Sequence, residues 1–155
     1  MKKEFKTLQI LYLALGLGQT FFAVIAFFLG TLRTSAFAAD KNLTLALTIA
    51  LSIVSISGIS MSYFLYRSKI TAARTKETAT EKMNEFRTAC MLRWALLEFP
   101  AFLSIIAFML TANMVFLGGF GIIFFAFLLA RPTIEKMAAD LELGFDETEE
   151  LTNSN

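Results

Sequence analysis

The chain has 155 residues with a net charge of +1; 56% of the residues are hydrophobic and 17 are phenylalanine. This apolar fraction exceeds the roughly 45–50% of soluble domains, so the composition favours an integral membrane protein. There is no histidine, Cys90 is the single cysteine, and the basic residues form no patch typical of nucleic-acid binding. We therefore expect no intramolecular disulfide, metal, cofactor or nucleic-acid partner.

Four apolar segments come close to the length that a membrane-spanning helix needs. They cover residues 8–30, 43–66, 91–113 and 114–130, against a requirement of about 20 residues and a lower limit near 17. The fourth segment sits at that lower limit. The pattern predicts an all-α membrane domain over residues 1–132, built as a bundle of four transmembrane helices.

The first segment has a second interpretation, as a secretory signal that is cleaved after Ala38. Lys2 and Lys3 precede the apolar run, and Ala36-Phe37-Ala38 imitates a cleavage site. The run of 23 residues exceeds the roughly 7–15 of a signal sequence, and Arg33 stands close to the cleavage site. We favour a membrane span and keep cleavage as the alternative.

Small and polar residues recur on one face of each of the first two segments. The spacing of three and four residues groups Tyr12, Gly16, Gln19, Ala23, Ala26 and Gly30 on the first, and Thr44, Thr48, Ser52, Ser55 and Ser62 on the second. Such residues pack helices together in lipid. We expect both faces to be buried and Gln19 to form an interhelical hydrogen bond. A polar permeation path is the alternative.

The connection between the second and third segments is predicted to be helical. Thr78 and Glu81 have the spacing of a capping box, and Ala79, Met83, Phe86 and Cys90 then share one helix face. That face is either a docking surface for a partner or an apolar face packed on its neighbours or on the membrane surface. We favour the second interpretation.

The basic residues are distributed unevenly along the chain. Three precede the first segment, seven lie between Tyr66 and Trp94, and two follow the fourth segment, which leaves only Arg33 and Lys41 on the other side. The positive-inside rule then places both termini in the cytoplasm. The predicted protein is multi-pass, with the lipid bilayer as its surroundings.

The C-terminal region is predicted to leave the membrane at Arg131-Pro132-Thr133. Residues 133–144 fit a short amphipathic helix with Ile134, Met137 and Leu141 on one side. Residues 145–155 are acidic and poor in apolar side chains, so we expect a disordered tail.

Glu98 is the one acidic residue inside an apolar segment, and ionisable groups at membrane depth are functional candidates. It lies five residues after Arg93, or about 7–8 Å into the membrane at the helical rise. Counting from the ends of the other segments predicts a polar cluster at this level, made of Glu98, Tyr12, Ser60, Ser62 and Arg131. Paired with Arg131, Glu98 would be a structural charge. Without a cation it would be a candidate proton carrier.

Pro100 follows Glu98 by two residues. Its ring lacks an N–H, which leaves the carbonyl near Leu96 without its helical partner. We expect a helix kink at this point, with a free acceptor close to the carboxyl group.

Enzymatic function is not expected. The apolar segments hold no second carboxylate, histidine is absent, and the Gly-rich stretches lie inside apolar helices and not at strand-to-helix turns. We expect a non-enzymatic accessory or structural subunit of a membrane assembly, as a homo-oligomer or with a membrane-protein partner. The alternative is a small ion- or proton-coupled transport component that acts as an oligomer through Glu98.

A motif in the C-terminal half carries a family resemblance. It comprises Glu81-Lys82-Met83, Phe86-Arg87, Arg93 to Glu98, Pro100-Ala101, Leu110-Thr111 and Arg131-Pro132-Thr133 with Lys136, Asp140 and Leu141. This half of the chain resembles a group of small, uncharacterised proteins with four transmembrane helices from Bacteroidota. The resemblance implies a location in the bacterial inner (cytoplasmic) membrane and no known activity.

Overall fold

The structure is a computed structural model that describes residues 2–32 and 41–144. In these residues the regular structure is helical: α1 (Lys2–Leu32), α2 (Lys41–Arg74), α3 (Ala79–Thr111), α4 (Met114–Leu129) and α5 (Ile134–Leu141). The predicted cleavage site at residues 36–38 and the acidic tail at 145–155 lie outside the described residues.

Within the described ranges, α1, α2 and α3 are each long and apolar enough to cross a membrane. Helix α4 has 16 residues and is followed, after a bend of 71°, by α5. By length and composition the described chain therefore has three candidate spans, or four if the bent pair counts as one. This is compatible with a multi-pass membrane protein.

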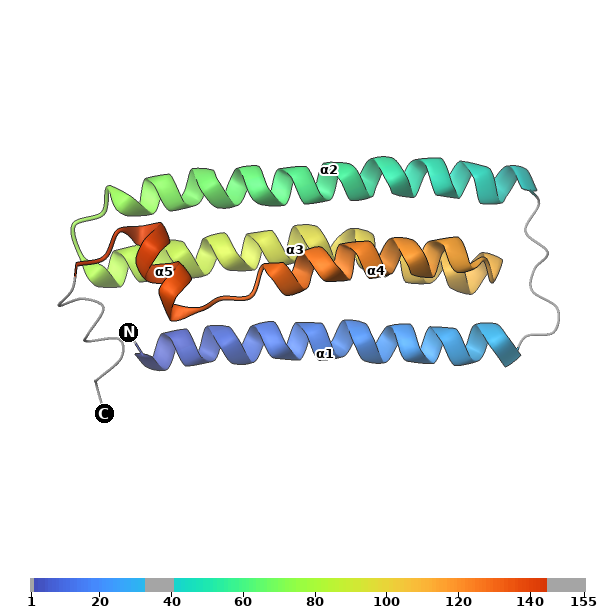
Figure 1. The fold of residues 1–155 in the computed structure, drawn as a ribbon, viewed down its shortest axis with the longest axis horizontal. Coiled ribbons are helices and arrows are strands. Elements are labelled where there is room, and N and C mark those ends of the chain that lie inside the picture. The colour runs from blue at the N-terminus through green and yellow to red at the C-terminus, as the bar shows by residue number, and fades with distance from the viewer. Residues whose placement is uncertain (1, 33–40, 145–155) are drawn as a thin grey trace.

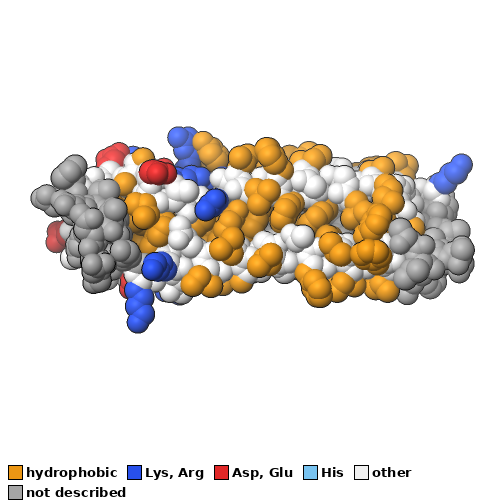
Figure 2. All heavy atoms as spheres, turned by 60° about the horizontal axis from the view of Figure 1, so that its bottom comes forward, with side chains coloured by type: hydrophobic (Ala, Val, Ile, Leu, Met, Phe, Trp, Pro, Cys, Tyr) orange, Lys and Arg blue, Asp and Glu red, His pale blue; other side chains and the backbone are white. Residues whose placement is uncertain are grey.

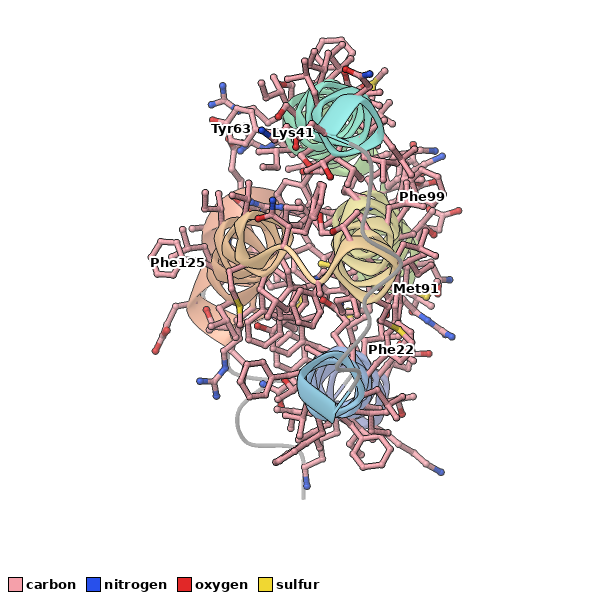
Figure 3. All side chains as sticks on the ribbon, turned by 90° about the vertical axis from the view of Figure 1, so that its right-hand side faces the viewer. Phe22, Lys41, Tyr63, Met91, Phe99 and Phe125 are labelled. Atoms are coloured by element: carbon pink, nitrogen blue, oxygen red, sulfur yellow. The ribbon has the colours of Figure 1, made fainter. Side chains whose placement is uncertain are left out.

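Helix α3 occupies the centre of the bundle. The four long helices lie side by side along one axis (Figure 1), and α3 contacts each of the other four helices. Viewed from the end near Lys41, α1 and α2 lie on opposite sides of the α3–α4 pair (Figure 3). Helix α5 packs on α2 and α3 at the end where α2 finishes and α3 begins.

Side-chain caps set the start of α3 and the turn into α4. The Thr78 hydroxyl accepts the Glu81 N–H at 3.3 Å, as the capping-box spacing predicts. At the other end, Ala112 adopts a left-handed conformation with φ of 52°, and the Asn113 side chain accepts the Val115 N–H at 3.0 Å. The apolar run that hydropathy divides at residue 113 is therefore divided by a tight turn at residues 112–113.

The core forms two clusters along the bundle. The larger includes Phe86, Trp94 and Leu97 of α3 with Met137 and Leu141 of α5, and the smaller contains Ala26, Ile105, Ala107, Phe108 and Phe116. Met83, Phe86 and Cys90, on the predicted apolar face of the connection, are buried in the larger cluster. This face is packed on its neighbours and is not a free docking surface.

Helix α1 packs against α3 and α4 through the stripe of small and polar residues that the sequence spacing predicts. Tyr12, Gln19 and Ala26 are at most 5% exposed. A Cβ added to Gly16 would lie 3.3 Å from the Phe127 ring, and one added to Gly30 would lie 2.9 Å from the Phe108 ring. The stripe is therefore the packing face of α1.

The prediction that the hydroxyl-bearing face of α2 is buried is confirmed in part. Ser62 is buried, three residues of the stripe are partly buried, and Ser52 is exposed; the partly buried residues are Thr44, Thr48 and Ser55. Ser62 donates to the Ile59 carbonyl at 2.7 Å, Ser52 to the Thr48 carbonyl at 2.7 Å, and Thr48 to the Thr44 carbonyl at 2.8 Å. Because these hydroxyls are bonded within their own helix, they can face lipid without a partner from another helix.

Helix α3 continues without interruption through Pro100. The carbonyl of Leu96, four residues earlier, lies against Gly58 of α2: a Cβ added to Gly58 would be 2.9 Å from this oxygen and 3.2 Å from Pro100 Cγ. The absence of a side chain at Gly58 thus lets the backbone of α2 cover the carbonyl that proline leaves without a helical donor. Pro100 serves as a packing contact between α2 and α3.

On the face seen in Figure 2, apolar side chains spread along most of the bundle, and charged side chains gather at the end where α1 begins and α5 lies. Phe99 of α3 and Phe125 of α4 are more than 60% exposed and point outwards (Figure 3). A surface of this kind suits a hydrocarbon environment better than water.

Candidate functional site

Glu98 lies in the seam between α3 and α1, and it is partly exposed at the surface of the bundle. Trp94, one turn earlier on α3, contacts the Tyr12 ring with centroids 5.4 Å apart. The residue of α3 at the level of Tyr12 is therefore Trp94. Glu98 lies four residues further along the helix, about 6 Å deeper at the helical rise, and this corrects the predicted level.

The polar neighbour of Glu98 is Gln19 of α1. Gln19 is completely buried, and neither its Oε1 nor its Nε2 has a partner in good hydrogen-bond geometry. The two side chains are neighbours that interact without a formed hydrogen bond, so the hydrogen bond predicted for Gln19 is absent from this structure. A buried amide without partners is uncommon and marks the seam as a site of interest.

The other residues of the predicted polar cluster are not brought to Glu98. Ser60 is exposed on α2, and Ser62 donates to its own helix. Arg131 is exposed and acts electrostatically on Tyr12; among residues 2–32 and 41–144 no ion pair joins it to Glu98. The predicted five-residue cluster is therefore not formed, and Glu98 lies beside the Gln19 amide instead.

Tyr12 contributes instead to a second network, at the C-terminus of α4. Its hydroxyl donates to the carbonyls of Phe127 and Leu128, both at 3.3 Å, and its ring stacks on Phe127 with centroids 4.8 Å apart. Trp94 Nε1 donates to the Ala130 carbonyl at 3.2 Å.

Lys136 Nζ completes this network by donating to the Leu129 carbonyl at 3.3 Å. The last turn of a helix leaves four carbonyls without the usual helical donors. Here the carbonyls of Phe127 and Leu128 accept the backbone N–H groups of Ala130 and Arg131 at 3.0 and 3.2 Å in addition to the Tyr12 hydroxyl. The carbonyls of Ala130 and Leu129 accept from the side chains of Trp94 and Lys136. In lipid such carbonyls would be costly if unpaired. The network therefore allows a helix of 16 residues to end beside the apolar core. Sequence reasoning missed it, although the lone Trp94 is a buried indole that needs an acceptor.

The chemistry of the Glu98–Gln19 pair is limited to hydrogen bonding and proton exchange. A primary amide can donate to a carboxylate or accept from a carboxylic acid, so Gln19 suits either form of Glu98. In the described part of the chain, no group of three or more His, Cys, Asp or Glu side chains is placed so that it could hold a metal ion.

Comparisons with known proteins gave no matching family model, no similar curated protein and no similar solved structure. The resemblance of the C-terminal half to small four-span proteins of Bacteroidota stays a prediction. The function of this protein is therefore inferred from the geometry of its own chain.

Proposed function

We propose that the protein is a non-enzymatic subunit of a membrane assembly, resident in a bacterial inner membrane with both termini in the cytoplasm. The positions of twelve of the fourteen Lys and Arg residues support this orientation. The observation that carries the subunit function is a groove between α2 and α4, which contact each other less closely than either contacts α3.

This groove has a volume of about 470 Å³, and Ser52, Ser55, Gly118 and Gly119 are among its lining residues. Gly118 is exposed, and a Cβ added there would meet nothing within 4 Å. The Ser52 hydroxyl is already bonded to its own helix. The groove thus offers close backbone approach without requiring a polar partner, which suits an apolar transmembrane helix of another protein.

The test compares two glycine substitutions. Gly118→Leu fills the groove, whereas Gly18→Leu adds the same side chain to α1, at another exposed glycine with nothing within 4 Å. After purification in mild detergent and mass spectrometry, we expect a stoichiometric partner that Gly118→Leu loses and Gly18→Leu keeps. Recovery of the chain only as a homo-oligomer, or equal recovery of the partner with both variants, would contradict the proposal.

A second candidate function, proton or ion handling by an oligomer, is favoured by the Glu98–Gln19 pair alone. A partly exposed carboxyl beside an amide that accommodates both of its forms could take up and release a proton at membrane depth. In reconstituted vesicles this function requires Glu98→Gln to abolish flux while the protein stays folded. Glu77→Gln, which removes an exposed carboxylate outside the apolar segments, is the matched control and should keep the flux.

A further inference from the structure

A pocket of about 860 Å³ lies where α2 and α3 meet α5, away from both the groove and Glu98. Four cationic side chains line it, and Asp140 is the one acidic residue among its lining residues: the cations are Arg67, Arg74, Arg93 and Lys136. The excess of positive charge indicates an anionic ligand.

Existing contacts use only part of this positive charge. Arg74 is engaged, because its Nε donates to the Asp140 carbonyl at 2.7 Å and its Nη1 lies 2.7 Å from Glu142. The Asp140 carboxylate accepts the Tyr66 hydroxyl at 2.5 Å. The charge of Asp140 also acts on Lys136, whose Nζ donates to the Leu129 carbonyl at 3.3 Å. Among the described residues no ion pair involves Arg93 or Lys136.

Arg93 is the residue whose bonding is incomplete. Its guanidinium stacks on the Tyr66 ring, with Cζ 4.9 Å from the centroid, and its Nε is buried without a hydrogen-bond partner. Burial first, and then the positive charge of Arg93, lower the pKa of Lys136 from its usual value. Two cations that repel each other, one with an orphaned donor, leave a place for an anion that accepts several hydrogen bonds.

The position of the pocket along the bundle indicates where such an anion comes from. One end of the pocket is lined by Tyr63 and Phe64, which are 53% and 67% exposed on the apolar surface of α2. The Arg67 guanidinium stacks on the Tyr63 ring, with Cζ 5.2 Å from the ring centroid. This contact lies at the border between the apolar and charged parts of α2. Tyr63 projects on the same side of the bundle as Phe125 of α4 (Figure 3). The cationic pocket therefore opens directly onto a surface that acyl chains can cover.

We propose that this pocket binds the phosphate group of an anionic phospholipid, with Arg93 and Lys136 as its principal donors and the acyl chains lying along α2 and α4. Guanidinium and ammonium groups suit a phosphate diester, and basic pockets at one end of a transmembrane bundle bind such head groups. A free phosphate compound would use the same cations but would gain nothing from Tyr63 and Phe64.

The test measures lipid binding to the purified, delipidated full chain by native mass spectrometry. The probes are dioleoyl phosphatidylglycerol, dioleoyl phosphatidylcholine and inorganic phosphate. We expect the phosphatidylglycerol to bind more tightly than the phosphatidylcholine, and Arg93→Gln to weaken its binding about tenfold through loss of charge-assisted bonds. Arg87→Gln removes the same charge from an exposed site on α3 outside this pocket and should leave binding unchanged.

Lys136→Gln provides a second, independent variant, so that misfolding of Arg93→Gln cannot decide the result. Thermal unfolding of each variant in detergent identifies any that fails to fold. Equal binding of the two lipids would overturn the proposal, as would unchanged phosphatidylglycerol binding in a folded variant that lacks either cation. Displacement of phosphatidylglycerol by inorganic phosphate at comparable concentration would show that the ligand is a free phosphate compound and that the lipid assignment is wrong.

Discussion

Gly58 of α2 lies against the backbone carbonyl of Leu96 in α3, so closely that an added Cβ would be 2.9 Å from the oxygen. The next closest contact of that Cβ would be Pro100 Cγ, at 3.2 Å. A glycine Cα–H facing a carbonyl at a helix–helix contact is a weak hydrogen-bond donor. The Leu96 oxygen has no helical donor, because Pro100 lacks an N–H. The contact with Gly58 thus gives this oxygen a neighbour from another helix.

Gly58→Ala is therefore expected to destabilise the bundle. The atom that the new methyl group meets belongs to the backbone of α3, which cannot rotate away, so the two longest helices must separate. We expect a loss of about 1–3 kcal/mol in the free energy of unfolding, measured by denaturant titration in detergent. Gly121→Ala is the control, because its Cβ would meet nothing within 4 Å; an equal loss in both variants would contradict this view of the contact.

Trp94→Phe is expected to destabilise the protein more than Tyr12→Phe. Trp94 is completely buried and its indole N–H supplies the Ala130 carbonyl; an unpaired buried carbonyl costs about 1–3 kcal/mol, and the smaller ring leaves a cavity. Tyr12→Phe keeps the stacking on Phe127 and removes only a donor shared between two carbonyls at 3.3 Å. Trp94→Phe should therefore have a lower midpoint of thermal unfolding than Tyr12→Phe. The reverse order would argue against the capping network.

Thr78→Ala tests the cap of α3. The substitution removes the acceptor of the Glu81 N–H, and we expect the stability to fall by about 1 kcal/mol. Thr80→Ala alters an exposed hydroxyl two residues later and is the matched control. Hydrogen exchange of the first turn of α3 provides the local measurement: amides near Glu81 should exchange faster in Thr78→Ala only.

Lys136 makes stability depend on pH in the alkaline range. Burial, followed by repulsion from Arg93, lowers the pKa of Lys136 in the folded protein below 10.5. Between that lowered pKa and 10.5 the unfolded chain binds more protons, so this group makes stability rise with pH across the window, and its penalty is fully present below it. Lys136→Gln should remove this rise when unfolding midpoints are compared from neutral to alkaline pH. A rise that persists unchanged in the variant would assign it to other groups.

The helices could be predicted from hydropathy, but their ends could not. The segments predicted at 8–30 and 43–66 lie within Lys2–Leu32 and Lys41–Arg74, because a transmembrane helix does not stop where its apolar residues do. The boundary between the third and fourth segments was predicted within two residues: the fourth segment begins at residue 114, as α4 does, whereas α3 ends at Thr111 and not at residue 113. Local bonds of Thr111 and Asn113 set the turn at residues 112–113, and an average over a hydropathy window does not detect such bonds.

The site depended on distances along the bundle that a sequence does not contain. The predicted level of Glu98 assumed that each helix enters the membrane at the first residue of its apolar segment. The contact of Tyr12 with Trp94 shows a different axial offset between α1 and α3, which brings Gln19 and not Arg131 to the carboxyl group. Periodicity had correctly placed Gln19 on the packing face of α1, because rotation about a helix axis follows from residue spacing alone.

The cap of α4 also has a consequence for biosynthesis. Tyr12 and Trp94 belong to helices that leave the ribosome before α4 does, and Lys136 follows it. The side-chain donors to the carbonyls of Phe127, Leu128 and Ala130 stand on helices that precede α4, whereas the donor to the Leu129 carbonyl stands on the helix that follows it. The packing of α4 therefore needs residues on both sides of it in the chain. A chain truncated after Ala130 would lack the donor for the Leu129 carbonyl and should hold α4 less firmly.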